Sequence, residues 1–194
     1  MDEVNIWGLN KVYIRPKKVF LKKINLLIRK NFKSKEKFYN KFSYKEVPYA
    51  TFRNLLKYSY YKYNFYSPLG LFMKICEKLN ISKFDLQKNI ESYKSAKGYN
   101  IIESPVLPIK ITPIFDMVLA HNIADGTVID PKRNRQIYFG YRQFDKNLRI
   151  AYIKKLESVF GKIRFKTQYF EESTRPYCPA VLSSLFFNYY NLTS

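Results

Sequence analysis

Apolar residues in the first half of the chain recur every three or four positions, the spacing of a helix face that packs on a core. Between residues 19 and 30, Phe20, Ile24, Leu27 and Ile28 share one such face. Ser and Pro residues stand where helices start, as N-caps or in the first turn. The pattern predicts five helices: over residues 19–30, after the N-cap Ser34, over 49–57 after Pro48, from Ser67-Pro68 onward, and from Ser82 through Tyr93.

The second half changes from helical spacing to a mixed pattern. Residues 100–113 hold three prolines among β-branched residues, which predicts an extended segment. A helix follows over residues 115–126, with Phe115, Val118, Leu119 and Ile123 at its spacing. The predicted elements after it are strands 127–129 and 137–143, helix 146–160 ended by Gly161, strands 163–169 and 175–178, and a closing helix 180–190.

The predicted helix over residues 115–126 has an unusual end. Ala120 and Ala124 form a pair of small residues four positions apart, which lets two helix backbones approach closely. Gly126 suits the αL conformation that ends many helices. Asp125 is out of place, because a carboxylate at a helix C-terminus opposes the helix dipole. Asp125 is therefore a candidate metal ligand.

Charge and composition indicate a class of partner. The chain has 35 Lys and Arg against 15 Asp and Glu, and +15 of its net charge of +20 lies in residues 1–110. This excess predicts a polyanion partner, with nucleic acid as the first candidate. No apolar run reaches the roughly 20 residues of a membrane-spanning helix, and the first residues do not resemble a signal peptide. Cys76 and Cys178 lack metal-ligand spacing, so we expect reduced, buried thiols in a cytoplasmic, nucleoid-associated protein.

Residues 118–126, Val-Leu-Ala-His-Asn-Ile-Ala-Asp-Gly, resemble the LAGLIDADG motif of homing endonucleases. The element order that follows, within about residues 111–194, is similar to the family's repeat of helix, two strands, helix, two strands and helix. The resemblance implies an αββαββα domain with a curved antiparallel sheet whose concave face lies in the DNA major groove. It also implies that Asp125, with Gly126, ends the motif as the catalytic acid and the ligand of Mg²⁺.

One copy of the motif supplies one Asp, so the resemblance implies a homodimer whose motif helices meet through Leu119, Ala120, Ile123 and Ala124. It implies DNA contacts from basic residues of the sheet and its loops: Lys132, Arg133, Arg135, Arg142, Arg164 and Lys166. For each of these, a solvated surface position explains the sequence equally well. Gln143 or Asp145, with Lys146, are candidates for the polar surroundings of the metal.

Two departures from the family pattern argue against cleavage. Ile123 stands where the family has its first Asp, and the chain lacks the Lys that some members carry beyond the closing helix. The alternative role for Asp125 is structural: its carboxylate caps a turn or the loop after it. His121, the only histidine, fits a packing or interface residue better than a catalytic base.

The five helices of the first half, with a helix, short link, helix pair among them, resemble the lambda-repressor type of helix-turn-helix domain. The segment Ser67-Pro-Leu-Gly-Leu-Phe-Met-Lys-Ile-Cys-Glu-Lys-Leu-Asn-Ile-Ser82 is similar to that family's fourth helix and its exit. The resemblance makes residues 49–57 the recognition helix, with Thr51, Arg53, Asn54 and Lys57 facing DNA. Arg suits guanine and Asn suits adenine in a major groove. The alternative is a small basic bundle whose polar side chains are merely solvated.

These patterns predict an α+β chain with an all-α helix-turn-helix bundle over residues 1–104 and an endonuclease-like domain over residues 105–194. The expected function is sequence-specific binding of double-stranded DNA, with cleavage if Mg²⁺ is bound. The alternative is a DNA-binding regulator or architectural protein that keeps the endonuclease fold without cutting. A third alternative is non-specific binding driven by charge, which predicts a steep salt dependence and no sequence preference.

Overall fold

The computed structural model describes residues 3–9, 11–42, 47–63, 65–96, 98, 100–128, 139–165 and 177–186. These residues form a mixed α+β chain with antiparallel strand pairs. The chain divides into two compact units, Tyr13–Glu91 and Met1–Val12 with Ser92–Ser194. This division differs from the expected boundary near residue 105, which stays a prediction. None of the described helices has the length and hydropathy needed to cross a membrane.

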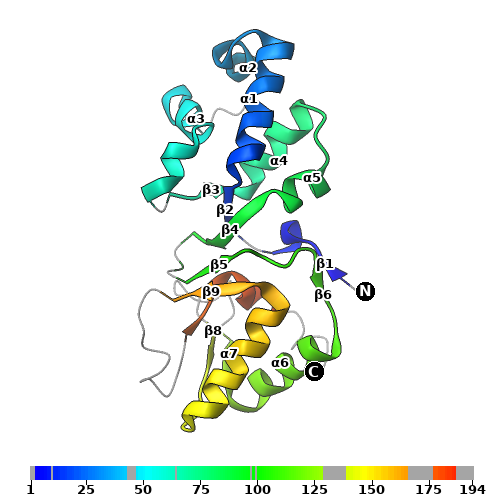
Figure 1. Ribbon diagram of the computed structural model, residues 1–194, viewed down its shortest axis with the longest axis vertical. Helices are drawn as coiled ribbons and strands as arrows, with labels where there is room; N and C mark the ends of the chain where they lie inside the picture. The colour runs from blue at the N-terminus through cyan, green and yellow to red at the C-terminus, as the bar shows by residue number, and fades with distance from the viewer. Residues whose placement is uncertain are drawn as a thin grey trace. The chain divides into compact units, whose positions relative to one another are not determined.

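The unit Tyr13–Glu91 is mostly helical, with strands interspersed (Figure 1). Its elements are β2 (Val12–Pro16), α1 (Lys18–Phe32), α2 (Lys35–Phe42), α3 (Tyr49–Leu55), the 3-10 helix η2 (Tyr58–Tyr63), β3 (Ser67–Pro68), α4 (Leu69–Lys78), α5 (Lys83–Lys88) and the start of β4 (Ile90–Ser95). β2 and β3 are antiparallel, with Ile14 opposite Ser67. The expectation of an all-α bundle is therefore wrong.

Two helix starts in this unit have the predicted serine cap. The Ser34 hydroxyl accepts a hydrogen bond from the Lys37 amide at 3.1 Å, and the Ser82 hydroxyl accepts one from the Asp85 amide at 3.0 Å. Both bonds satisfy backbone donors that have no partner inside the first helical turn. α2 and α3 then pack through aromatic rings: the centroid of Phe52 lies 5.9 Å from that of Phe38 and 5.3 Å from that of Tyr39.

The predicted helix from Ser82 through Tyr93 is too long. α5 ends at Lys88, and the chain continues as strand β4, although Ile90 and Tyr93 are buried as expected. The amide of Lys17 donates to the Asn89 carbonyl at 2.8 Å, just after the helix. Within the other unit, Ser92 of β4 pairs with Glu103. The strand is stabilised by partners distant in sequence, which a local periodicity does not reveal.

The unit formed by residues 1–12 and 92–194 contains the motif helix. Its elements are β1 (Glu3–Val4), the 3-10 helix η1 (Ile6–Gly8), the rest of β4, β5 (Ile101–Glu103), β6 (Ile109–Lys110), α6 (Pro113–Asp125), β7 (Gly126–Val128), β8 (Phe139–Tyr141), α7 (Lys146–Phe160), β9 (Lys162–Arg164), β10 (Tyr177–Cys178) and the 3-10 helix η3 (Ala180–Leu182). Residues 183–186 continue as helix. From α6 onward the order is helix, two strands, helix, two strands, helix, as predicted. The single curved sheet expected of this domain is not what the described strands form, because β9 pairs with β5 whereas β10 pairs with β8.

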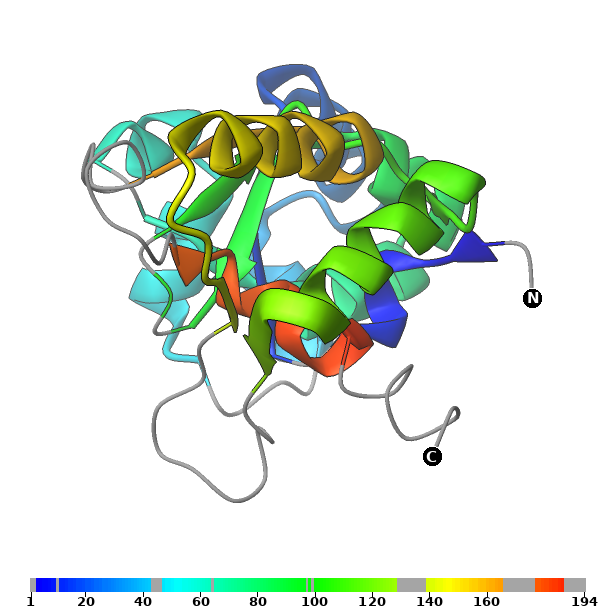
Figure 2. The same cartoon turned by 90° about the horizontal axis from the view of Figure 1, so that it is seen from below.

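The described strands of this unit form three antiparallel groups. β8 lies between β7 and β10, β5 lies between β4 and β9, and β1 pairs with β6. α6 packs against α7 (Figure 2). Phe115 of α6 meets Phe160 of α7 and Phe186 of the closing helix, with centroids 6.2 and 6.1 Å away. These rings form the core that holds the motif helix.

Candidate metal site and nucleic-acid interface

The motif helix α6 ends at Asp125, and β7 begins at the next residue, Gly126. Gly126 has φ −96° and ψ 176°, so the expectation of an αL glycine here is wrong. Glycine is required for space instead: a Cβ on Gly126 would overlap the carbonyl oxygen and the side-chain amide of Asn122. The Asp125-Gly126 step turns the chain directly from helix into strand.

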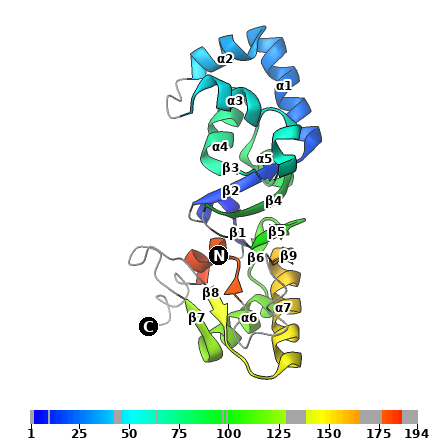
Figure 3. The ribbon, with the colours of Figure 1, turned by 90° about the vertical axis from the view of Figure 1, so that its left-hand side faces the viewer.

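Asn122 is the buried polar residue at this turn, with 1% of its surface exposed. Its side-chain Nδ2 donates to the Gly140 carbonyl of β8 at 3.2 Å. Figure 3 shows β7 and β8 side by side next to α6. Asn122 thereby ties α6 to the hairpin. Sequence reasoning missed this role, although Asn122 follows Phe115 and Val118 at helical spacing on the buried face.

The carboxylate of Asp125 is exposed at the end of α6. Gln143 Nε2 donates to Asp125 Oδ2 at 3.4 Å, and the Arg142 amide donates to the Asp125 carbonyl at 2.7 Å. The structure thus brings Gln143 next to Asp125, as predicted, whereas a metal ion there stays a prediction. Arg142 and Gln143 lie beyond the end of β8, so strand alternation does not govern which way they face.

Asp145, the other predicted polar neighbour, has a structural role. It is the N-cap of α7: its Oδ1 accepts hydrogen bonds from the amides of Asn147 at 2.7 Å and Leu148 at 3.1 Å. Its own amide donates to Gln143 Oε1 at 3.3 Å. Lys146 starts α7 with an exposed side chain. Asp145 therefore orients Gln143 instead of offering a free carboxylate.

Arg149 is a second buried group that the sequence did not reveal. Its side chain is nearly inaccessible, with 4% exposed, and its Nη1 donates to the carbonyls of Gln143 at 2.8 Å and Phe144 at 2.7 Å. Charged donors to carbonyls make strong hydrogen bonds. Arg149 thus fixes the loop that carries Gln143 beside Asp125. In the sequence, Arg149 looks like an ordinary surface arginine of an amphipathic helix.

His121 lies one turn before Asp125 and is half-buried. Its Nε2 is 3.1 Å from Lys155 Nζ of α7, and its ring meets the rings of Tyr141 and Tyr152 edge-on. These contacts agree with the expected packing role. Among the described residues, no three His, Cys, Asp or Glu side chains gather in a group that could hold a metal ion.

The predicted dimer face lies on the outer side of α6. Ala120 and Ala124 are exposed, Leu119 is half-buried, and Ile123 is 54% exposed. Ile114 and Met117 add exposed apolar surface to the same helix, at 45% and 47%. Ile123, which the resemblance placed in the dimer face, is therefore accessible, and it lies about 80° around the helix from the buried Phe115. α6 therefore shows apolar surface on both its inner and its outer side.

The predicted basic contacts have different outcomes. Lys132, Arg133, Arg135 and Lys166 lie outside the described residues. Arg142 is exposed, with its guanidinium 5.4 Å from the centroid of the Phe144 ring. Arg164, at the end of β9, forms an ion pair with Glu103 at 3.0 Å. Of this set, Arg142 is the described residue with an exposed side chain, and its backbone amide bonds to the Asp125 carbonyl.

α3 carries the residues predicted to read bases. Arg53 and Lys57 are exposed, and Thr51 and Asn54 are half-buried. Lys35, at the start of α2, belongs to the same positive surface: burial, then the charges of Lys57 and Arg53, lower its pKa below the usual value. Three cations, Lys35 of α2, Arg53 of α3 and Lys57 two residues after α3, thus gather on one surface, which an anionic ligand would stabilise.

Cys76 and Cys178 are both buried free thiols, as expected. Burial raises the pKa of each to about 12. A thiol with so high a pKa is almost entirely protonated at neutral pH and reacts slowly. Neither cysteine lies in the candidate sites described above.

Comparison of the chain with protein-family models, with curated proteins and with solved structures finds no match.

Proposed function

We propose that this protein binds double-stranded DNA as a homodimer of the LAGLIDADG type, with an N-terminal helix-turn-helix module. The observation that carries the proposal is the end of α6. There a helix with an apolar outer side ends in an exposed Asp, and a strand pair starts at the next residue. The helix, two strands, helix, two strands, helix order after it supports the same assignment.

The outer side of α6 supports pairing with a second copy of the chain. Met117 and Ile123 expose about half of their surfaces, and Ala120 and Ala124, which lie between them around the helix, are small enough for close helix contact. Burying apolar surface contributes about 25 cal/mol per Å². A two-fold axis near Ala120 would bring two copies of this surface together, and the same patch on both subunits is what such an axis requires. Each subunit would then contribute one Asp125.

The donor set of one chain fits a shared magnesium site better than a complete one. Mg²⁺ is usually held by one or two carboxylates together with water and substrate phosphates, and one chain offers the exposed Asp125 carboxylate. The ion would neutralise charge on a phosphodiester and lower the pKa of a bound water. Asp125 would hold the ion, and Gln143, fixed by Arg149, would hold the carboxylate in position.

The helical unit supports a separate role in recognition. α2 and α3 pack through Phe38, Tyr39 and Phe52, and they expose Arg53 and Lys57 next to Lys35. We assign base contacts to Arg53 and Asn54 on α3, because these side chains suit guanine and adenine edges in a major groove. Thr51 and Lys57 would contact the sugar-phosphate backbone.

A second candidate function is DNA binding without cleavage, by a regulator or architectural protein. Ile123 replaces an acid of the family motif, and Asp145 caps α7 instead of facing Asp125. Both features lower the number of carboxylates near Asp125. This candidate predicts the same dimer and the same DNA complex as the first.

Incubation with supercoiled plasmid and a random duplex library, with and without Mg²⁺, separates the two candidates. An endonuclease should cut the DNA only with Mg²⁺, and Asp125→Asn should reduce the cleavage rate by about 10³-fold or more while DNA affinity is kept. Asp116→Asn, also an exposed acid of α6, is the matched control and should cut like wild type. Sequence-selective binding without cutting would favour the regulator. Absence of binding to any duplex would contradict both.

A further inference from the structure

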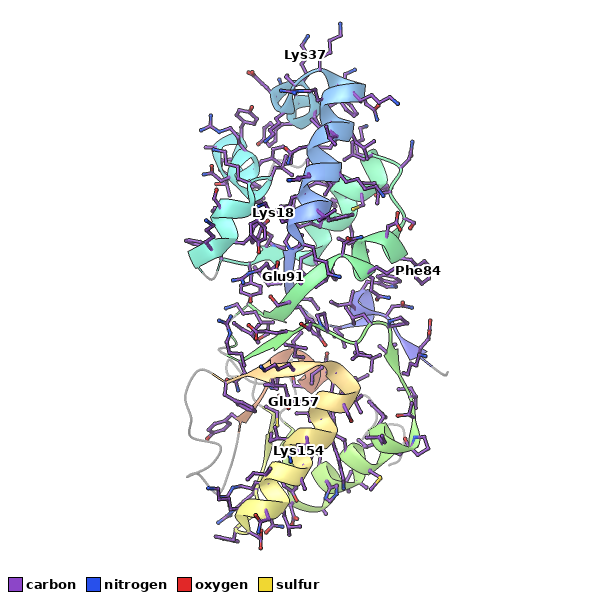
Figure 4. The ribbon with its side chains drawn as sticks, in the orientation of Figure 1. Lys18, Lys37, Phe84, Glu91, Lys154 and Glu157 are labelled. Carbon is purple, nitrogen blue, oxygen red and sulfur yellow. The ribbon has the colours of Figure 1, made fainter. Side chains whose placement is uncertain are left out.

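The outward face of α1 is strongly basic. Lys18, Lys22, Lys23, Arg29 and Lys30 are all exposed, and the helix contains no Asp or Glu. Figure 4 shows Lys18 near the start of this helix and Lys37 beyond its other end. The opposite face of α1, with Phe20, Ile24 and Ile28, is buried in the core of its unit. The basic face is therefore held in a fixed orientation by the packing behind it.

The cations fall into two rows along the helix. At about 100° per residue, Lys18, Lys22 and Arg29 lie within an arc of about 40°, and Lys23 and Lys30 lie within about 20° on the other side. The first row runs along about 16 Å of helix and the second along about 10 Å. Val19 and Leu26 lie between the rows, 74% and 67% exposed.

The start of this arrangement disfavours the helix, whereas Arg29 and Lys30 in the last turn suit the helix dipole. Lys18 lies in the first turn, where the helix dipole repels a cation, and it is four residues from Lys22, so the two charges repel each other. Lys23 has an ion pair with Asp85 at 3.2 Å. Among the described residues, the other four cations of the two rows have no acidic partner. An ordinary solvated surface mixes both signs of charge, so the pattern indicates an anionic ligand.

We propose that the outward face of α1 binds the phosphate backbones of a nucleic-acid duplex without reading its sequence. The two rows suit two lines of phosphates, and Val19 and Leu26 between them suit sugar carbons and thymine methyl groups. The inference rests on the proposed DNA binding for the class of partner. It places a binding surface on α1 in addition to the base-reading residues of α3.

The test compares two quadruple variants of the full chain. One variant, K18Q/K22Q/R29Q/K30Q, neutralises four of the five cations in the two rows and keeps the Lys23–Asp85 pair. The other, K62Q/K78Q/K83Q/K88Q, removes the same charge from exposed lysines of η2, α4 and α5. The affinity of the wild type and of each variant for a fluorescein-labelled 24-base-pair duplex of arbitrary sequence is measured by titration at salt concentrations from 0.05 to 0.3 M. Circular dichroism should show intact folding in both variants.

The first variant should lose affinity on the order of a hundredfold at 0.1 M salt, and the slope of log K against log salt should fall by about 3.6, as expected for four lost phosphate contacts. The second variant should change the slope by less than about one. Equal losses in the two variants would overturn the inference and leave the proposed function intact. Failure of the wild type to bind any duplex would contradict both. Binding to phosphatidylserine vesicles that depends on the two rows, without an effect on duplex binding, would also overturn it.

Discussion

Gly161→Ala should lower the free energy of unfolding by about 3 kcal/mol or more, the largest single effect we expect from a methyl group in this chain. Gly161 ends α7 with φ 105°, a conformation that residues with a Cβ rarely adopt. A Cβ there would also lie 2.8 Å from Pro105 Cα and 2.9 Å from the Ser104 carbonyl oxygen. Both neighbours are backbone atoms, so no side chain can move aside to relieve the overlap.

Gly70→Ala is the matched control for this prediction. Gly70 lies in α4, and an added Cβ there would meet no atom within 4 Å. The alanine should stabilise the protein by about 0.5–1 kcal/mol, because glycine disfavours helix. Urea denaturation followed by circular dichroism measures both variants. An unfolding midpoint of Gly161→Ala close to that of the wild type would show that the α7 end does not approach residues 103–105.

Gly126→Ala should also destabilise strongly, by about 2–3 kcal/mol. The reason differs from that at Gly161, because the backbone of Gly126 is in an ordinary extended conformation. The added methyl group would overlap both the carbonyl and the side chain of Asn122, and Asn122 holds α6 to Gly140 of β8. The variant should therefore also loosen the position of Asp125.

Two measurements test this second prediction. Urea denaturation gives the loss of stability, again with Gly70→Ala as control. Hydrogen exchange of the Arg142 amide, which donates to the Asp125 carbonyl, reports the local turn and should become faster in Gly126→Ala. Unchanged stability together with an unchanged exchange rate at Arg142 would contradict the close approach of Gly126 to Asn122.

Local patterns predicted most helices of this chain because local physics determines them. Ser34 and Ser82 cap helices through their own side chains, and Gly161 ends α7 as expected. The spacing of Phe20, Ile24 and Ile28 identified the buried face of α1. Each of these signals lies within a few residues of the element that it defines.

Strands and buried polar groups were harder to predict from sequence. β4 has buried residues at positions that also fit a helix, and its pairing with β5 decides between the two. β2 and β3 are short and pair across about 50 residues of sequence. No strand was predicted for either segment, because neither alternates polar and apolar residues over enough positions.

The candidate site was predicted in part. The sequence placed Asp125 at the end of a helix and Gln143 near it, and the structure brings them together. The sequence did not reveal that Arg149 and Asp145 fix the loop that carries Gln143. In a sequence, a buried arginine and an N-cap aspartate look like surface charges. Whether the site binds magnesium and DNA stays a prediction.

The central claim, that α6 meets its copy in a second chain, can be tested by disulfide trapping of Ala120→Cys. Cys76 and Cys178 are 1% and 3% exposed, so the new thiol would be the accessible one among the described residues. A disulfide needs Cα atoms within about 7 Å, which is reached only where two helices touch. Lys154→Cys, on the exposed side of α7 (Figure 4), is the control. We predict that mild oxidation converts Ala120→Cys, with or without duplex DNA, into a linked dimer while Lys154→Cys stays monomeric. A monomeric Ala120→Cys under both conditions would contradict the account.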